Sequence, residues 1–444
     1  MKHPLAHQLR TTAVLGTAAL LLATAACGSP GEEDPAAGQS AAEPTSPVTL
    51  TWQAAPFGNR ADDARVWLVE EFEAEHPNID IEVISAPTNV DTNRASLATQ
   101  IMGGASTPDI YNGDVAWAAQ LADNGLALPV DRYLPEDYFD GFDPAVVEGA
   151  TFEDQVFGIP LTLDQSFLYY RKDLLEKHGL PVPGTWQEVA EQARTLQDAG
   201  EVAEGITWQG ASYEGLTAVT NEFVASAGGS LVNEDLSEGL IDSPEATEAV
   251  EFMRDLVADG TSPRGVPTYQ EPQSLQTFTN GDAAFMRNWA YAYATAENEE
   301  TSGIAGKVGV TSMPAFGDGD TNAASVGGWN VYVNPHTEQL GASLTFLKWL
   351  TSAETQTDLA KRSSTIPTLD AVREAADVQV LSPVIVASAG NDLVARPTAS
   401  PYYPQISQSI YGQVNGILAG TTETGAGLEA ARNGIRSALE GRSL

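Results

Sequence analysis

The chain has 444 residues, of which 42% are hydrophobic, and this length suggests two domains rather than one core. Asp and Glu number 60 against 22 Lys and Arg, which gives a formal net charge of -38 at pH 7. Such a charge excludes electrostatic binding to a nucleic acid backbone, and we interpret it as an acidic, well solvated surface.

Residues 1–26 predict a secretory signal peptide, because Lys2 and Arg10 precede an uncharged apolar run that is shorter than a membrane span. Cys27 is the only cysteine, so no intrachain disulfide is possible, and small residues precede it. This pattern resembles a lipobox. We therefore predict that Cys27 carries a lipid anchor, the alternative being a free buried thiol. Residues 27–47 are rich in Gly, Pro, Ala, Ser and Glu, which predicts a flexible, lipid-anchored tether.

Strand and helix patterns alternate from residue 48 to residue 123. The helical run 62–76, for example, places Ala64, Leu68 and Phe72 on one face. Such alternation is typical of an α/β lobe with a largely parallel sheet. The predicted elements are strand 48–52, helix 62–76, strand 79–84, helix 91–102, strand 109–112 and helix 115–123.

Residues 158–175 predict a crossover between two lobes. Pro160 lacks a backbone N–H, so the segment begins extended rather than helical. A short buried strand over 166–170 and a helix over 172–178 are predicted to follow. Asp164 lies between the apolar and the aromatic-rich runs, where a carboxylate is poorly solvated unless a partner donates hydrogen bonds to it. We expect that partner to be a ligand in a cleft.

The remaining chain is predicted to visit both lobes. The extended apolar run 308–313 is interpreted as a second crossing back to the first lobe. Two short extended crossings permit hinge closure without a change in either core. The second lobe is predicted to contain helices 186–199, 216–227 and 243–259. Strand 327–333 and helix 337–351 are predicted to belong to the first lobe. The predicted N-terminal lobe is 48–163 plus 312–369, and the C-terminal lobe is 164–311 plus 370–444.

Several short motifs occur in one order along the chain, namely Glu71-Phe72, His76-Pro77-Asn78-Ile79, Thr107-Pro108-Asp109-Ile110, Arg287-Asn288-Trp289-Ala290-Tyr291 and Val326-Gly327-Gly328-Trp329. With them the chain resembles family 1 of the extracellular solute-binding proteins of ABC sugar importers, and within it the trehalose- and maltose-binding lipoproteins. The resemblance implies a two-lobe, type II periplasmic-binding-protein-like fold. It also implies a monomer at the extracellular face of the membrane that binds a neutral saccharide and delivers it to permease subunits.

A neutral sugar needs carboxylates and arginine for its hydroxyls and aromatic rings for its apolar faces. The resemblance implies that Trp289 and Trp329, from different lobes, are such rings, with Tyr291 in the same turn as Trp289. Gly328 would let the ligand approach the backbone. The tryptophans interpreted as core residues are those at 52, 67, 117, 186, 208 and 349.

The candidate hydrogen-bonding residues are acids and arginines. Asp164 and Asp114 are the acids, although Asp114 would serve equally as a helix N-cap. Arg94 and Arg396 match positions where relatives place sugar-binding arginines, and the alternative for both is a surface arginine. The further candidates are Asn59 and Glu222.

Enzyme interpretations find little support in the sequence. After residue 26 the chain has His76, His178 and His336, which suggest neither a metal site nor a Ser-His-Asp triad. We find no P-loop, dinucleotide fingerprint or Gly-x-Ser-x-Gly elbow, so no cofactor or metal is expected. The alternative function is a secreted glycoside hydrolase or lyase that uses two of the many acids.

Overall fold

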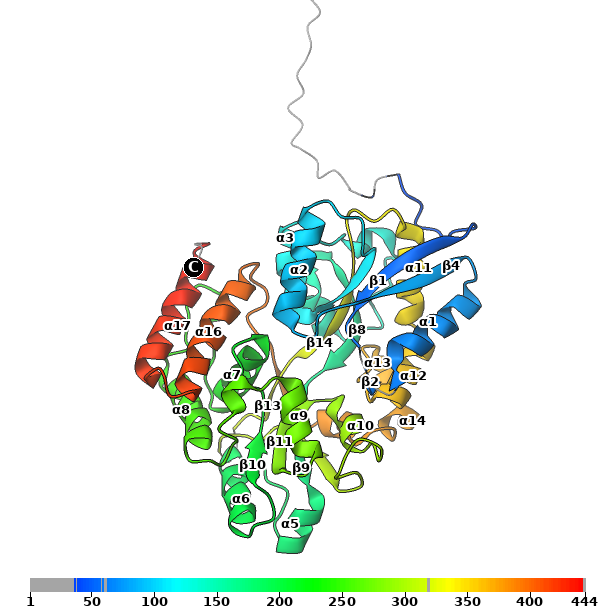
Figure 1. Cartoon of the computed structure of the whole chain (residues 1–444). Helices are drawn as coiled ribbons and strands as arrows, with labels where there is room; N and C mark the ends of the chain where they lie inside the picture. Colours follow the sequence, from blue (N-terminus) through cyan, green and yellow to red (C-terminus); the bar gives the residue numbers. More distant parts are fainter. Residues whose placement is uncertain (1–35, 37, 57, 60–61, 318–319, 442–444) are drawn as a thin grey trace, which may run out of the picture.

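Two β-sheets organise the protein, as the computed structural model in Figure 1 shows. The structure describes residues 36, 38–56, 58–59, 62–317 and 320–441, so the predicted signal peptide and Cys27 lie outside the described residues. Among the described residues, no helix combines the length and the apolar character needed to cross a bilayer. The two-lobed α/β fold predicted from the sequence is confirmed.

The first sheet has the order β4-β1-β5-β14-β8. Its strands are β1 (Val48–Ala54), β4 (Ile79–Ser85), β5 (Ile110–Asp114), β8 (Gly158–Asp164) and β14 (Gly327–Val333). β1 runs parallel to β4 and β5, whereas β14 runs antiparallel to β5 and β8. The sheet is therefore mixed rather than largely parallel, because β14 enters it from the other lobe.

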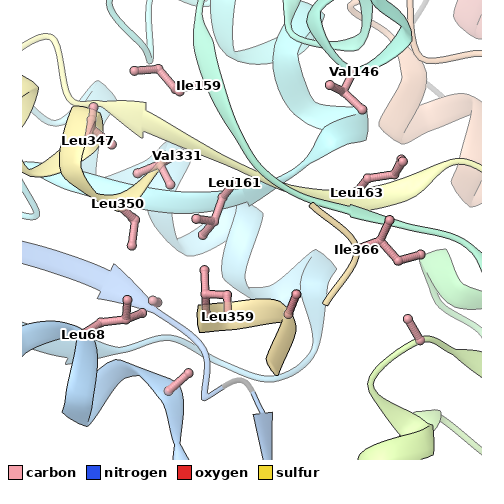
Figure 2. Packing of buried hydrophobic residues seen from close by; sticks show 14 of the residues in the cluster. Leu68, Val146, Ile159, Leu161, Leu163, Val331, Leu347, Leu350, Leu359 and Ile366 are labelled. Carbon is pink, nitrogen blue, oxygen red and sulfur yellow. The ribbon is translucent and has the colours of Figure 1, made fainter. Parts of the chain in front are cut away.

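Helices cover this sheet, and the core lies between them and the strands. They are α1 (Ala64–Glu75), α2 (Val90–Met102), α3 (Ala118–Asp123), α4 (Pro144–Gly149), α11 (Leu340–Leu350) and α12 (Ala353–Ser363). Figure 2 shows Leu161 of β8 and Val331 of β14 close to Leu350 and Leu359 of the helices. These four side chains are at most 2% exposed, as expected for the period-2 and helical patterns that place them inward.

The second sheet has the order β10-β11-β9-β12. Its strands are β9 (Ser166–Arg171), β10 (Glu204–Thr207), β11 (Ala283–Trp289) and β12 (Val308–Thr311). Its helices are α5 (Lys172–His178), α6 (Trp186–Asp198), α7 (Glu214–Ser226), α8 (Pro244–Ala258), α9 (Glu271–Thr279), α10 (Ala292–Ala296), α16 (Tyr403–Leu418) and α17 (Thr424–Leu439). α16 packs on both α7 and α17, which joins the end of the chain to this lobe.

The first crossing is one residue long. β8 ends at Asp164, β9 begins at Ser166, and Gln165 alone connects the two sheets. The second crossing was predicted over 308–313, and this position is wrong. Those residues begin with β12, which pairs antiparallel with β9 in the second sheet. An apolar extended run cannot by its sequence be distinguished from an edge strand.

The chain reaches the first sheet only at Val326, between β13 (Ala323–Ser325) and β14. β13 pairs in parallel with β15 (Asp392–Val394) and contacts α7, so it lies with the second lobe although residues 312–369 were assigned to the first. Conversely, α13 (Asp370–Arg373) packs on α12 of the first lobe, and Arg373 donates to Asp143 there over 2.9 Å.

Part of the predicted tether contacts the first lobe. Gln39 donates to the carbonyl of Thr337 over 2.7 Å and accepts from the amide of Leu340 over 3.3 Å. Glu43 pairs with His76 over 2.9 Å. The prediction of a flexible tether is therefore wrong for these residues, because Gln39 bonds to polar groups near the start of α11 and Glu43 pairs with the residue that ends α1.

Candidate functional site

The ends of β5, β8, β11 and β14 meet where the chain crosses between the sheets (Figure 1). Within the first sheet, Trp329 pairs with Asp114, and Gly327 pairs with Asp164. In the second sheet Trp289 pairs with Ser166, the first residue after the crossing. The structure thus brings together two predicted acids and two predicted rings, and each ring comes from a different sheet.

Both of these tryptophans are half-buried, unlike most of the others. Trp52, Trp186 and Trp208 are fully buried, and Trp67 and Trp117 are at most 7% exposed, so their predicted core positions are confirmed. Trp349 is half-buried against Phe72 and Phe346.

Asp164 is held by the backbone and keeps one oxygen free of protein donors. Its Oδ1 accepts from the amides of Gln165 over 2.8 Å and Ala290 over 3.0 Å. Among the described residues, no donor bonds to Oδ2. Burial raises the pKa of Asp164 to about 7, and the amides of Ala290 and Gln165 and the charge of Arg287 oppose that rise. A carboxyl group in this setting gains from a ligand hydroxyl that donates to it.

Asp114 has both roles considered for it. Its Oδ1 accepts from the amide of Ala116 over 2.8 Å, which caps a 3-10 turn, and from Nη2 of Arg396 over 2.9 Å. The cap explains why an acid stands at the end of β5, and the ion pair links it to a loop almost 300 residues away.

Arg396 is buried, so the alternative of a surface arginine is wrong for it. Only 4% of the residue is exposed, and its guanidinium donates to Asp114, to Oε1 of Glu214 over 2.6 Å and to the carbonyl of Val326. Its Nε has no hydrogen-bond partner among the described residues. Glu214 also accepts from the hydroxyls of Tyr403 and Ser407, and burial raises its pKa.

Glu214 was not among the residues predicted from the sequence. It is the first residue of α7, where an acid is ordinary because it suits the helix dipole, so no local signal marked it. Its amide donates to Oδ2 of Asp91 over 3.0 Å, and Asp91 in turn accepts from Arg94 over 3.2 Å. Arg94 also donates to Gln120 over 3.1 Å. Arg94 therefore lies on α2 beside the start of α7, at a contact between the lobes.

Glu222 is fully buried and has a structural set of partners. It forms an ion pair with Arg287, and it accepts from the hydroxyl of Ser166 over 2.7 Å and the amide of Ser325 over 3.3 Å. Both side chains of the pair are 0% exposed. In this arrangement the carboxylate of Glu222 has no surface on which a ligand could bind.

Gly328 was predicted to let a ligand approach the backbone, but the structure gives another reason for the glycines before Trp329. Gly328 has φ +124°, and a Cβ there would lie 2.1 Å from the carbonyl oxygen of Thr162. A Cβ on Gly327 would lie 2.7 Å from Cζ3 of Trp289. Both positions thus require glycine for the packing of the protein itself.

The last two candidates lie at the margins of this region. Tyr291 is half-buried and precedes α10, where it packs against the hydrophobic core. Asn59 lies in the short strand β2 (Gly58–Asn59), which contacts α10 across the lobes. No cluster of three His, Cys, Asp or Glu side chains suited to a metal occurs in the part of the chain that the structure describes.

Residues 58–357 match the family model of the bacterial extracellular solute-binding proteins. The chain belongs to this family. A probable ABC transporter-binding protein of Deinococcus radiodurans is 30% identical over 417 residues, which cover 91% of this solute-binding protein and 96% of the relative. The maltotriose-binding protein of Pyrococcus abyssi is 24% identical over 355 residues, or 79% of this chain and 72% of the relative.

Solved structures agree with the family. The maltose-bound MalE3 of T. maritima superposes with a TM-score of 0.82 and 31% identity, covering 87% of this solute-binding protein and 99% of that chain. The GacH receptor of Streptomyces glaucescens, solved with acarbose, superposes with a TM-score of 0.77 at 24% identity. The match covers 89% of this solute-binding protein and 99% of that chain, and it shows a similar fold. The predicted resemblance is confirmed, and the family places this solute-binding protein outside the cytoplasm.

Proposed function

We propose that this chain is the receptor of an ABC importer and captures a neutral saccharide of the trehalose or maltose type between its lobes. It then delivers the saccharide to the permease subunits of the membrane. The names of two relatives, a maltose-bound and a maltotriose-binding protein, support this class of ligand. The shared chemistry of these ligands is many hydroxyls on a ring with apolar faces.

One observation carries the proposal. The Oδ2 atom of Asp164 has no donor among the described residues, and Asp164 lies at the crossing, two residues from the strand partners of the half-buried Trp289 and Trp329. A sugar supplies hydroxyl donors for the carboxylate and C–H faces for the two rings. Rotation of the lobes about Gln165 and Val326 would bring the two rings onto one ligand.

The proposed location is the extracellular face of the membrane, with a lipid on Cys27 as the anchor. The contacts of Gln39 and Glu43 with the first lobe then leave a short connection between the anchor and the fold. We propose that the protein acts as a monomer, since all the residues proposed for the site come from one chain.

The second candidate, a glycoside hydrolase, draws on the two acids. Asp114 is ion-paired, whereas burial raises the pKa of Asp164 to about 7, and such a division suits a carboxylate and a general acid. We favour binding without catalysis because the family and the relatives are binding proteins.

A thermal-shift screen followed by calorimetry tests both functions. Maltose, maltotriose, trehalose, mannitol and glucose are compared, and a ligand at 100 times its Kd should stabilise the fold by about 2.7 kcal/mol. Stabilisation by a saccharide that is recovered intact supports the proposal. If no sugar binds, the proposed receptor function is wrong. Release of glucose from trehalose would establish the hydrolase instead.

A further inference from the structure

The ion pair of Glu222 and Arg287 lies deeper than any ligand would reach. Nε of Arg287 donates to Oε2 of Glu222 over 2.8 Å and Nη2 donates to Oε1, while Nη1 donates to Gln209 over 2.9 Å. Both charged side chains are fully buried. A buried pair of this kind gains little stability over well packed apolar residues, because both charges lose their hydration. Such a pair instead fixes the relative positions of the groups that bond to it.

Glu222 connects the crossing at Gln165 with the crossing at Val326. The hydroxyl of Ser166, the first residue of β9, donates to its Oε1 over 2.7 Å. The amide of Ser325, the last residue of β13, donates to the same oxygen over 3.3 Å. One carboxylate oxygen thus holds the residue that follows the crossing at Gln165 and the residue that precedes the crossing at Val326.

Arg287 also contacts Trp289, and it thereby links the ion pair to that ring. Its guanidinium carbon lies 4.3 Å from the centroid of the indole ring, in a cation–π contact. The two residues are next but one on β11, and Gly327 also lies close to the ring, since a Cβ there would meet Cζ3 of Trp289 at 2.7 Å. The ring orientation of Trp289 therefore depends on where Glu222 holds Arg287.

We propose that Glu222 is a positioning residue: through Arg287 it orients the ring of Trp289, and through Ser166 and Ser325 it holds both crossings in register with that ring. The part of this inference that concerns sugar rests on the proposed function. The carboxylate of Glu222 acts through its neighbours and does not touch the ligand.

The test is a double-mutant cycle on maltose binding by calorimetry. Glu222→Gln keeps the size of the side chain and removes its charge, and it should weaken maltose binding roughly 10-fold. The loss should disappear in a Trp289→Ala background and persist in a Trp329→Ala background. Thr220→Val is the matched control, because Thr220 is buried on the same helix and its hydroxyl donates to the carbonyl of Leu216 in that helix. It should lower Tm and leave the Kd unchanged.

Tryptophan emission tests the same inference without any sugar. A further variant, Ser166→Ala, tests it without changing a buried charge. The emission of Trp289 is obtained by subtracting the spectrum of the Trp289→Phe form, and it should change in Glu222→Gln. Ser166→Ala removes one donor to Glu222 and should weaken binding less, again only when Trp289 is present. It decides the question if Glu222→Gln does not fold.

A lower Tm with an unchanged Kd and unchanged Trp289 emission would overturn the inference and make Glu222 a stabilising residue only. If the parent protein binds no sugar, the proposed function fails, whereas the Trp289 emission still decides whether Glu222 orients the ring.

Discussion

Nη2 of Arg396 lies 2.9 Å from Oδ1 of Asp114, so two side chains predicted separately as sugar ligands bind each other. The guanidinium also pairs with Glu214 of the second lobe, whereas Asp114 ends a strand of the first sheet. Arg396 therefore bridges the lobes. A ligand would find at Asp114 only the second carboxylate oxygen, Oδ2, for which no described residue is a donor.

Asp114→Asn should separate the ligand role from the cap. The amide oxygen can still accept from Ala116, but the charge that faces Arg396 is lost, so we expect about 1 to 2 kcal/mol lower stability and roughly 10-fold weaker maltose binding. The control is Asp143→Asn, because Asp143 also caps a helix and pairs with an arginine, Arg373. It should lose stability only. Equal affinity in the two variants would exclude Asp114 from the site.

Trp289→Ala and Trp329→Ala should each weaken the binding of several sugars to a similar extent. Loss of about 80 Å² of apolar contact corresponds to roughly 2 kcal/mol, or about a 30-fold rise in Kd. Trp349 is the control, since it is also half-buried but packs on Phe72 in the first lobe. Calorimetry of the three variants against maltose and maltotriose checks this. A Trp349→Ala effect as large as the others would mean that the losses come from unfolding.

The stability of the empty protein should depend on Asp164 between about pH 4 and pH 7. Burial raises its pKa from 3.8 to about 7, so the folded state keeps a proton that the unfolded chain has already lost. The stabilisation is present below about pH 4 and is lost as the pH rises through 7. At about 1.4 kcal/mol per pKa unit, the upper bound is about 4 kcal/mol, and the true value is smaller because the side chain is half-buried.

Asp164→Asn should remove this pH dependence. The variant should be as stable as the parent or more stable at pH 8, because Asn still accepts from Gln165 and Ala290. Urea unfolding at pH 4, 6 and 8 measures it. Maltose should bind the parent more tightly at pH 8 than at pH 6, since hydroxyl donors favour the carboxylate, and this difference should be absent in the variant. If the variant binds normally yet unfolds early, Asp164 is a structural residue.

Gly328→Ala should destabilise the fold strongly. The added Cβ would lie 2.1 Å from the carbonyl oxygen of Thr162 at a φ of +124°, and we expect a loss of roughly 3 kcal/mol or more. Gly104→Ala isolates the backbone cost, because Gly104 has φ +80° and open space around its Cβ position. That variant should lose about 1 to 2 kcal/mol. Similar losses in both variants would show that the contact with Thr162 relaxes.

Cys27→Ser should release the mature protein into the medium. Without the thiol no lipid can be attached at this position, and the proposed anchor is lost. Fractionation of cells that express the variant, with Ser29→Ala as the control, measures the release. A Cys27→Ser protein that stays with the membrane would show that the anchor has been misassigned.

The sequence by itself determined the two-lobed α/β class, the crossover at Asp164 and the tryptophans of the core. These features depend on the alternation of strands and helices, on Pro160 and on the hydrophobic pattern, all of which act over a few residues. The family motifs also pointed to Trp289 and Trp329, which the structure brings to the crossing from different sheets. Such signals can be read from residues that are close together in the sequence.

Only the tertiary structure decided which charges pair. Arg396 meets Asp114 from 282 positions away, and Glu222 meets Arg287 from 65 positions away. Nothing near either residue in the sequence distinguishes a buried ion pair from a ligand contact, because both need the same charged groups. Burial then decides the outcome: a fully enclosed carboxylate such as Glu222 must be satisfied by the protein, whereas Asp164 at the crossing has one oxygen to which no described residue donates.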